Sequence, residues 1–124
     1  SLGIASKGIY ETKKIDKIIG QRLLEYTEQE NDGKLRFKEK IRKEANSRQL
    51  NVNSKTIPFK NKFHIRFCRN ILIYFNKDSR LAAENRIFKS LANGGFIFLG
   101  DAEVLSSKNQ DFEQLGNGIY RKRI

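Results

Sequence analysis

The pattern of apolar and polar positions along the chain predicts a mixed α/β protein. A short β-type run at Phe63–Cys68 has the length and the aromatic and β-branched content of a strand. Asp78 or Ser79 can cap a helix that follows this strand, and apolar residues recur at helical spacing along one face of it. The buried stripe of that helix consists of Ala83, Ile87, Phe88 and Leu91.

The last third of the chain continues the pattern. We expect the helix to end at Asn93-Gly94-Gly95, and residues 96–99, a continuous apolar run, to form a strand buried on both faces. Residues 112–115 and 119–121 flank Gly116-Asn117-Gly118 and predict a β-hairpin. Strand, helix, strand and hairpin in this order make half of a doubly wound sheet with an antiparallel edge.

The first part of the chain has shorter elements separated by charged residues. Asn31-Asp32-Gly33 signals a turn, and residues 34–38 then alternate between apolar and basic side chains, as in a half-buried strand with a basic outer face. Residues 49–52 are a candidate strand, and residues 53–62 are typical of a surface loop. Helical spacing of apolar residues also predicts a helix over residues 15–27, with Ile15, Ile18, Ile19, Leu23 and Tyr26 on one face.

Size and cysteine content limit the classes of protein that fit. A chain of 124 residues has room for one small domain, and because it contains no Met and begins at Ser1 we expect it to be a piece of something longer. No apolar run is long enough to insert into a membrane. The single cysteine, Cys68, fits a small buried hydrophobe in a reducing cytoplasm.

The charge of the chain is strongly basic. Its 25 Lys and Arg residues against 14 Asp and Glu residues give a net charge of +11. This excess is consistent with an acidic protein partner, with nucleic acid, or with a drift in composition. Nucleic acid is the weakest of these interpretations, because no zinc-finger spacing, RNA-binding signature or helix-turn-helix pattern accompanies the charge.

Polar residues interrupt the apolar pattern directly after the strand Phe63–Cys68. In an open α/β sheet, ligands bind just beyond the carboxyl ends of the strands, so Arg69 and Asn70 are candidate ligand contacts. Each candidate also has a structural interpretation. Arg69 can be an ion-pair partner, Asn70 can cap a short helix, and Tyr74 can pack against Phe75 as a core aromatic pair.

The string from Cys68 to Phe75 closely resembles the signature of the CheR-type chemotaxis receptor methyltransferases. The resemblance runs from Ala5 to Tyr120 and includes residues 91–100, which are similar to the helix-to-strand step of the family. Residues 100–103, Gly-Asp-Ala-Glu, stand where the family usually has Gly-His-Ser-Glu, so that Glu103 keeps the pattern and the two residues before it do not.

The resemblance implies a fold, a cofactor and a set of site residues. The fold is α/β: the C-terminal half of a Rossmann-like S-adenosylmethionine-dependent methyltransferase sheet (about residues 49–124), with a small β-subdomain insert (about residues 11–48). It implies that S-adenosyl-L-methionine is the cofactor and that Tyr74 lies near the transferred methyl group and the substrate carboxylate. It implies no metal. The implied cofactor contacts are Asn51, Val52, Arg69 and Asn70.

The resemblance also implies a function: O-methylation of glutamate side chains on chemoreceptors in the cytoplasm, during chemotaxis adaptation. The implied partner is an acidic helical surface of the chemoreceptor cytoplasmic domain. The glycine-containing cofactor loop and the ribose-binding acid of the family would precede Ser1, so we expect the isolated chain to lack half of the cofactor site and to be inactive. Alternatives are a non-enzymatic remnant or interaction module of the same fold, and a basic nucleic-acid-binding domain.

Overall fold

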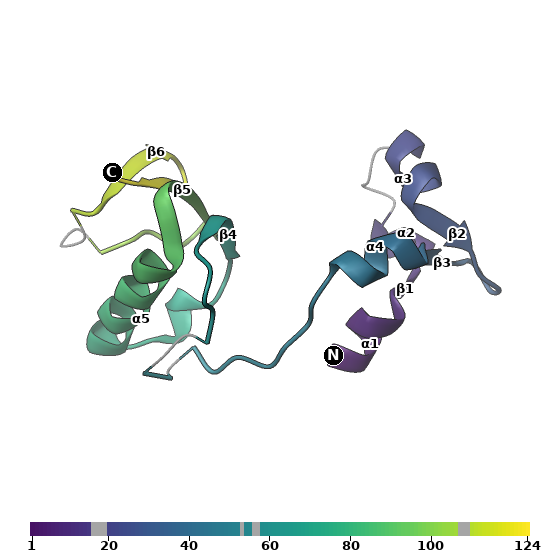
Figure 1. Cartoon of the computed structure of the whole chain (residues 1–124), viewed down its shortest axis with the longest axis horizontal. Helices are drawn as coiled ribbons and strands as arrows, with labels where there is room; N and C mark the ends of the chain where they lie inside the picture. The colour runs from purple at the N-terminus through teal and green to yellow at the C-terminus, as the bar shows by residue number, and fades with distance from the viewer. Residues whose placement is uncertain (16–19, 53, 56–57, 107–109) are drawn as a thin grey trace. The chain divides into compact units, whose positions relative to one another are not determined.

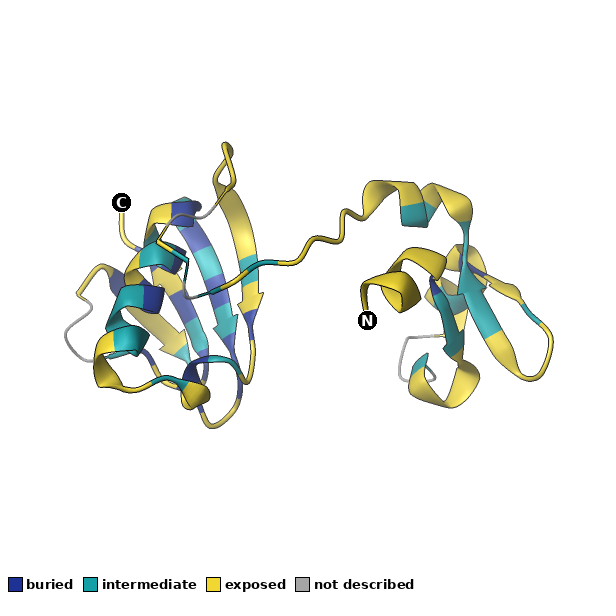
Figure 2. Ribbon diagram, turned by 90° about the horizontal axis from the view of Figure 1, so that it is seen from below, coloured by how far each residue is buried: buried dark blue, intermediate teal, exposed yellow. Residues whose placement is uncertain are grey.

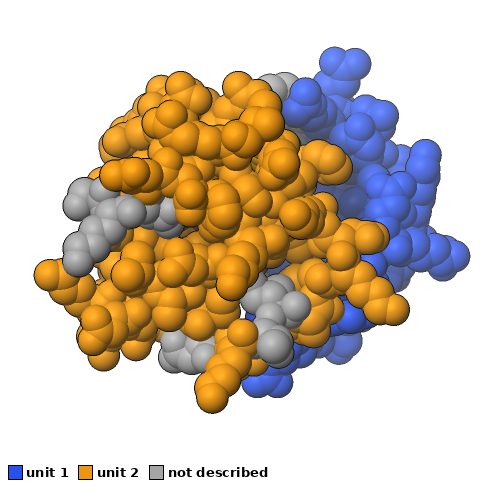
Figure 3. All heavy atoms as spheres, turned by 60° about the vertical axis from the view of Figure 1, so that its left-hand side comes forward, with its two compact units in different colours: residues 1–50 blue, residues 51–124 orange. Residues whose placement is uncertain are grey.

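The computed structural model describes residues 1–15, 20–52, 54–55, 58–106 and 110–124. It divides the chain into two compact units, Ser1–Leu50 and Asn51–Ile124, called unit 1 and unit 2 below (Figure 3). None of the helices among the described residues is long and apolar enough to cross a membrane.

Unit 1 is built from short helices around a small antiparallel sheet (Figure 1). Its strand β3 lies between β1 and β2 and runs antiparallel to both. The elements are α1 (Leu2–Lys7), β1 (Ile9–Glu11), α2 (Thr12–Ile15), α3 (Gly20–Tyr26), β2 (Thr27–Gln29), β3 (Lys34–Phe37) and α4 (Glu39–Glu44).

The predicted turn at the start of β3 is confirmed. Asp32 and Gly33 both have positive φ angles, of 64° and 67°, which join β2 to β3 tightly. The helix that we expect to run to about Thr27 ends at Tyr26, because Thr27 belongs to β2 and pairs with Phe37. Ile18 and Ile19 of the expected apolar face lie outside the described residues.

Little of unit 1 is buried. Among its described residues, only Gly8 and Thr27 are buried, and the remaining side chains are half-buried or exposed (Figure 2). The aromatic rings of Tyr10 and Phe37 pack edge to face at 6.0 Å across β1 and β3. A unit with so thin an apolar core has little hydrophobic stabilisation of its own.

Unit 2 contains a four-stranded mixed sheet in the order β4-β5-β7-β6. Strands β4 and β5 are parallel and joined by the helix α5, while β7 runs antiparallel to both β5 and β6, as the sequence predicts. The elements are β4 (Phe63–Cys68), the 3-10 helix η1 (Leu72–Tyr74), α5 (Lys77–Ser90), β5 (Leu91–Leu99), β6 (Phe112–Gly116) and β7 (Ile119–Lys122).

The core of unit 2 lies between α5 and one face of the sheet (Figure 2). Ala83 and Ile87 of α5 pack with Ile97 and Leu99 of β5 in this core. The opposite face is less covered: the ring of Phe67 is 74% exposed and stacks on Phe98 at 5.0 Å. The expectation that residues 96–99 are buried on both faces is therefore wrong, because Phe98 is only half-buried.

Contacts distant in sequence set the ends of α5. The helix is capped by Asn76, whose Oδ1 accepts a hydrogen bond from the Ser79 N–H at 2.9 Å, and not by Asp78 or Ser79 as expected. It ends at Ser90, before the expected Asn93-Gly94-Gly95, and β5 begins at the next residue. The buried Lys122 amine donates hydrogen bonds to the carbonyls of the last helical turn and of the first strand residue, and so stabilises this early end.

The predicted strand at residues 49–52 is also wrong. Residues 45–51 have no regular structure, and Val52 packs against the core of unit 2 in a turn. The Val52 carbonyl accepts a hydrogen bond from Arg86 of α5 at 2.9 Å. An apolar side chain can be buried against a helix as well as in a sheet, so the apolar residues at positions 49–52 did not by themselves distinguish a strand from a packed turn.

Candidate functional site

The parallel strands β4 and β5 end at the same edge of the sheet, where Cys68 pairs with Leu99. The residues that follow them, Arg69-Asn70 after β4 and Gly100-Asp101 after β5, are therefore brought together. Asn70 has a positive φ of 57°, which turns the chain sharply at the end of β4. We call residues 69–73 the β4 turn. It is the kind of place at which open α/β sheets bind ligands.

A buried carboxylate holds this turn. The Glu103 side chain accepts hydrogen bonds from four successive backbone N–H groups of the β4 turn: Asn70 (2.6 Å), Ile71 (2.9 Å), Leu72 (2.8 Å) and Ile73 (3.3 Å). Its Oε2 also accepts from the Gly100 N–H at 2.8 Å. Glu103 is 1% exposed, so water does not compete for these bonds.

The charge state of Glu103 follows from these donors. Burial by itself raises the pKa of a carboxyl group, but the backbone N–H groups of Gly100, Asn70, Ile73 and Leu72 stabilise the ionised form. Their combined effect prevails, and the pKa of Glu103 lies below its ordinary value. The carboxylate is therefore an anion at neutral pH.

The backbone on either side of Glu103 is held as well. Its own N–H donates to the Gly100 carbonyl at 2.9 Å, and the Leu105 N–H donates to the Tyr120 hydroxyl at 3.3 Å. The Ser106 N–H donates to the Glu84 carboxylate at 3.0 Å, and the Arg80 guanidinium bonds to the Val104 carbonyl. The loop after β5 is thus fixed to both α5 and β7.

Position 100, beside this carboxylate, has room for glycine but not for a residue with a Cβ atom. A Cβ atom at position 100 would lie 2.8 Å from Glu103 Oε2 and 3.1 Å from the Asn70 nitrogen, and it would also meet the Asn70 side-chain oxygen. The backbone after β5 at Gly100 therefore approaches the backbone after β4 at Asn70 more closely than a residue with a side chain would allow.

The structure distinguishes between the interpretations of Arg69 and Asn70. Arg69 pairs with Asp101 at 3.4 Å, which confirms that it is an ion-pair partner, although the side chains are 55% and 92% exposed. Such a pair contributes little to stability, on the order of 0–1 kcal/mol, and leaves the guanidinium accessible. The helix-cap interpretation of Asn70 is wrong, because η1 has no side-chain cap and Glu103 binds the N–H groups that need one.

Tyr74 does not pack as a core aromatic residue. It is 79% exposed at the end of η1, whereas its neighbour Phe75 packs against the core. The structural interpretation of Tyr74 is therefore wrong, and its hydroxyl is accessible beside the β4 turn. The preceding residue, Ile73, is 48% exposed and adds apolar surface next to the Tyr74 ring.

Asn51 and Val52 come from the segment before β4. Asn51 is exposed, while Val52 is half-buried and faces the core and α5. The structure gives Val52 a packing role, and its assignment as a cofactor contact, like that of Asn51, stays a prediction.

Three other residues of β4, Cys68, Arg66 and His64, are not assigned to the site. Burial raises the pKa of the Cys68 thiol, and the charge of Glu103 raises it further, so Cys68 is an inert, protonated core residue. Arg66 bonds to the Ser90 hydroxyl and its guanidinium lies 5.3 Å from the centre of the Phe63 ring. His64 is exposed.

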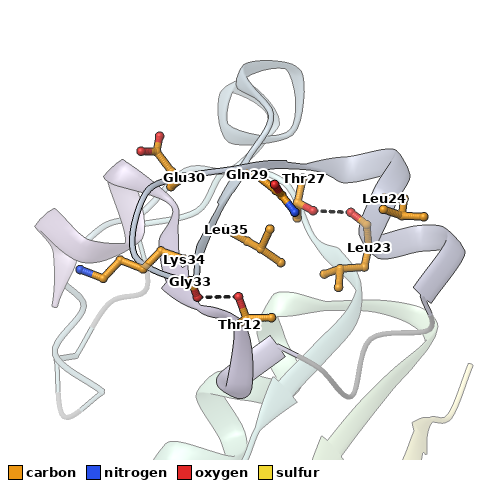
Figure 4. A pocket seen from close by; sticks show the side chains of 9 residues that line it. All are labelled: Thr12, Leu23, Leu24, Thr27, Gln29, Glu30, Gly33, Lys34 and Leu35. Atoms are coloured by element: carbon orange, nitrogen blue, oxygen red, sulfur yellow. Dashed lines mark hydrogen bonds between the residues drawn. The ribbon is translucent and has the colours of Figure 1, made fainter.

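Unit 1 has a pocket of its own, of about 360 Å³ (Figure 4). Its hydroxyl groups are already engaged: Thr12 donates to the Gly33 carbonyl at 2.6 Å, and Thr27 donates to the Leu23 carbonyl. What remains for a ligand is mainly apolar surface. The lining residues are Thr12, Leu23, Leu24, Thr27, Gln29, Glu30, Gly33, Lys34 and Leu35.

Comparison with known proteins identifies the family. The family model described as "CheR methyltransferase, SAM binding domain" matches residues 1–120. The chain therefore belongs to the CheR methyltransferase family. Its fold is the C-terminal part of a Rossmann-like methyltransferase domain, and its cofactor is S-adenosylmethionine, as the resemblance implied.

Relatives of this CheR family member are chemotaxis protein methyltransferases. The chain is 29% identical to one from Borreliella burgdorferi, over 98% of this chain and 42% of the relative. It is 30% identical to one from Vibrio anguillarum, over 92% and 42%, and 32% identical to chemotaxis protein methyltransferase 1 of Pseudomonas aeruginosa, over 98% and 46%. The chain thus spans less than half of the length of these relatives.

The residue that sequence reasoning missed is Glu103. The family pattern marked it as retained, but no local signal shows that its carboxylate lies beside the β4 turn. Its nearest hydrogen-bond partners in that turn are 30 or more positions earlier in the chain.

Proposed function

We propose that this chain is part of an enzyme that transfers a methyl group from S-adenosylmethionine to glutamate side chains of chemoreceptors. The observation that supports this most is the β4 turn: Arg69, Asn70 and Tyr74 are exposed beside the carboxyl ends of two parallel strands. The relatives are chemotaxis protein methyltransferases, which favours a chemotaxis role and a cytoplasmic location.

The side chains at the β4 turn fit this cofactor chemically. Arg69 and Asn70 offer hydrogen-bond donors and an acceptor to an amino-acid and nucleoside ligand. The Arg69 guanidinium takes part in an exposed ion pair, which is weak enough to be exchanged for a ligand. When bound, S-adenosylmethionine supplies an electrophilic methyl group. In this proposal Arg69 and Asn70 hold the cofactor, together with Asn51 and Val52 from the segment before β4.

The substrate chemistry requires few protein groups. A glutamate carboxylate is already ionised at neutral pH, so methylation needs no strong general base. The protein has mainly to align the attacking oxygen with the methyl group, which is a positioning task. The Tyr74 hydroxyl orients the substrate carboxylate by a hydrogen bond, and an exposed tyrosine is accessible to a side chain on another protein.

The proposed partner is an acidic helical surface of the chemoreceptor cytoplasmic domain. The chain has a net charge of +11, which would attract such a surface over long range. Of this charge, +4 lies in unit 1 and +7 in unit 2. In unit 1, Lys38 follows directly on β3 and Lys40 lies in the first turn of α4.

We further propose that activity requires the remaining length seen in the relatives. The chain covers 42% of the Borreliella burgdorferi protein. The cofactor contacts within this chain would therefore have to offset the whole entropic cost of immobilising S-adenosylmethionine. We expect no binding of S-adenosylmethionine by the chain alone at micromolar concentration, as measured by calorimetry. A clear micromolar dissociation constant would show that the β4 turn suffices.

The function is tested in a chimera that joins the unmatched portion of the Borreliella burgdorferi relative to this chain. We expect the chimera to transfer radiolabelled methyl groups to a chemoreceptor cytoplasmic domain. Tyr74→Phe should slow turnover by roughly 10- to 100-fold, about 1.4–2.7 kcal/mol of barrier, with cofactor affinity little changed. Arg69→Ala should weaken cofactor binding as well, because its role lies in the cofactor site.

Tyr26→Phe is the matched control, because it removes a hydroxyl from an exposed tyrosine of unit 1. It should leave turnover unchanged. Normal turnover in Tyr74→Phe would show that Tyr74 does not orient the substrate. A chimera that binds the cofactor but methylates no receptor would refute the proposed substrate.

A non-enzymatic interaction module is the second candidate. One observation favours it: β4 lies at the edge of the sheet, and its exposed Ile65 (55%) and Phe67 (74%) leave apolar surface for another protein to cover. In that case the chimera would bind the receptor and fail to bind S-adenosylmethionine.

A further inference from the structure

We propose that Glu103 is the positioning residue of the cofactor site: its carboxylate fills an anion-binding hollow in the β4 turn and thereby sets the directions of Arg69 and Asn70. This inference rests on the proposed function, because Glu103 acts through Arg69 and Asn70, the residues proposed there to hold the cofactor.

The β4 turn has the geometry of an anion site. Successive backbone N–H groups that converge on one point form a concavity that binds anions such as phosphate. Here the positive φ of Asn70 makes the N–H groups of residues 70–73 converge, and all four donate to the Glu103 carboxylate. A side chain of the same chain therefore occupies the place that a ligand phosphate would take in a nucleotide-binding protein.

The occupied hollow suits the cofactor. S-adenosylmethionine carries a carboxylate but no phosphate, so an anion hollow left open at the strand ends would favour phosphate-bearing ligands over this cofactor. Filling the hollow internally satisfies the buried donors and excludes phosphate ligands, which would have to displace a carboxylate with five hydrogen bonds. The turn is then free to present only its side chains to the ligand.

Glu103 can position the turn because its own place is fixed. The loop that carries it is bonded to α5 through Glu84 and Arg80, and to β7 through Tyr120. The carboxylate accepts five backbone hydrogen bonds, one of them from the Gly100 N–H, so it cannot shift without losing bonds. The core of unit 2 is thus connected through Glu103 to the two residues proposed to hold the cofactor.

The first test is spectroscopic and uses the 124-residue chain. Glu103→Gln keeps the shape of the side chain but replaces one acceptor oxygen with an NH₂ group, which faces N–H donors. We expect the backbone N–H signals of residues 70–73 to move and to lose protection from hydrogen exchange, while that of Ile97 in the core strand stays. Glu113→Gln, the same change at an exposed site of β6, should alter neither.

The pH dependence of the unaltered chain gives an independent readout. The pKa of Glu103 is lower in the folded chain than in the unfolded one, so its stabilising effect is fully present above the unfolded pKa. It is lost as the pH falls through the folded pKa. The four N–H signals of residues 70–73 should therefore titrate together at that lower pH. Titration at the pKa of an ordinary glutamate, or no common titration, would contradict the assignment even if Glu103→Gln fails to fold.

The second test measures cofactor affinity in the chimera. We expect Glu103→Gln to weaken S-adenosylmethionine binding at least tenfold and to leave the KM for the receptor unchanged, whereas Glu113→Gln should change neither. Altered N–H signals with unaltered cofactor affinity would make Glu103 merely structural and overturn the inference. If the unaltered chimera itself binds no cofactor, the proposed function fails, and the N–H signals still decide whether the carboxylate holds the turn.

Discussion

Gly100→Ala tests whether the strand ends are as closely packed as the structure indicates. The added Cβ would lie 2.8 Å from Glu103 Oε2, while ordinary contacts at such atoms begin at 3.4 Å. The carboxylate oxygen must therefore retreat by about 0.6 Å. That movement lengthens its hydrogen bonds from the Asn70 and Gly100 N–H groups, now 2.6 Å and 2.8 Å, to about 3.2 Å and 3.4 Å and so weakens both.

The cost of this movement can be worked out from the two bonds. A hydrogen bond to a charged group contributes about 1.5–3 kcal/mol, so weakening two of them should cost about 2–4 kcal/mol. The smaller conformational freedom of alanine in the unfolded chain offsets about 0.4–1 kcal/mol of this. We expect the free energy of unfolding of unit 2 to fall by about 2–3 kcal/mol, equivalent to a drop in Tm of about 10–20 °C for a unit of this size.

Urea unfolding followed by NMR measures this change in unit 2 separately from unit 1. The Ile97 N–H signal reports on the core strand of unit 2, where Ile97 is fully buried. Gly116→Ala is the matched control, because the nearest atom to its added Cβ is Ile119 Cδ1 at 3.9 Å. It should change the free energy of unfolding by less than about 0.5 kcal/mol. Equal unfolding midpoints for the two variants would refute the reasoning.

Two further predictions concern other parts of the chain. Lys122→Met removes the amine that donates to the Phe88 and Leu91 carbonyls at 3.1 Å and 3.0 Å, so unit 2 should lose about 1–3 kcal/mol of stability in thermal unfolding. Lys89→Met, at an exposed position of α5, should not lower the stability, and equal stability of the two variants would contradict the role of Lys122 at the helix end. Reversing the charges at positions 38 and 40 to Glu should slow receptor association in the chimera, and less so as salt rises, since surface charges are screened over about 8 Å at physiological ionic strength. The control reverses Lys60 and Lys62 of unit 2, which have the same spacing, and should slow association less. Equal slowing by the two double variants would show that net charge alone causes the attraction. Unchanged receptor binding together with lost nucleic-acid retention would favour a nucleic-acid partner.

Elements with strong local signals were predictable from the sequence. Phe63–Cys68 forms β4 as its aromatic and β-branched residues indicated. The hairpin of β6 and β7 turns at Asn117-Gly118, where Gly118 has a positive φ of 68° that favours glycine. Right-handed crossover geometry then leaves few ways to arrange a strand, a helix and a second strand. The sheet topology follows from these local signals.

Element boundaries were less predictable because distant residues set them. The apolar spacing predicts a helix whose buried stripe includes Leu91, and Asn93-Gly94-Gly95 is its local stop signal, yet α5 ends at Ser90. Leu91 instead begins β5, where it pairs with Phe63, and the Lys122 amine binds its carbonyl from a strand 31 positions later. A helix and a strand can use the same apolar residue, and tertiary contacts decide which forms.

The candidate site divides in the same way. The sequence by itself determined that polar residues follow β4, and its resemblance to the family singled out Arg69, Asn70 and Tyr74. Only the tertiary structure decided that Tyr74 is exposed and that Glu103 binds the N–H groups of the turn. The physical reason is that these hydrogen bonds join residues 30 or more positions apart, which become neighbours only because β4 and β5 are parallel and end at the same edge of the sheet.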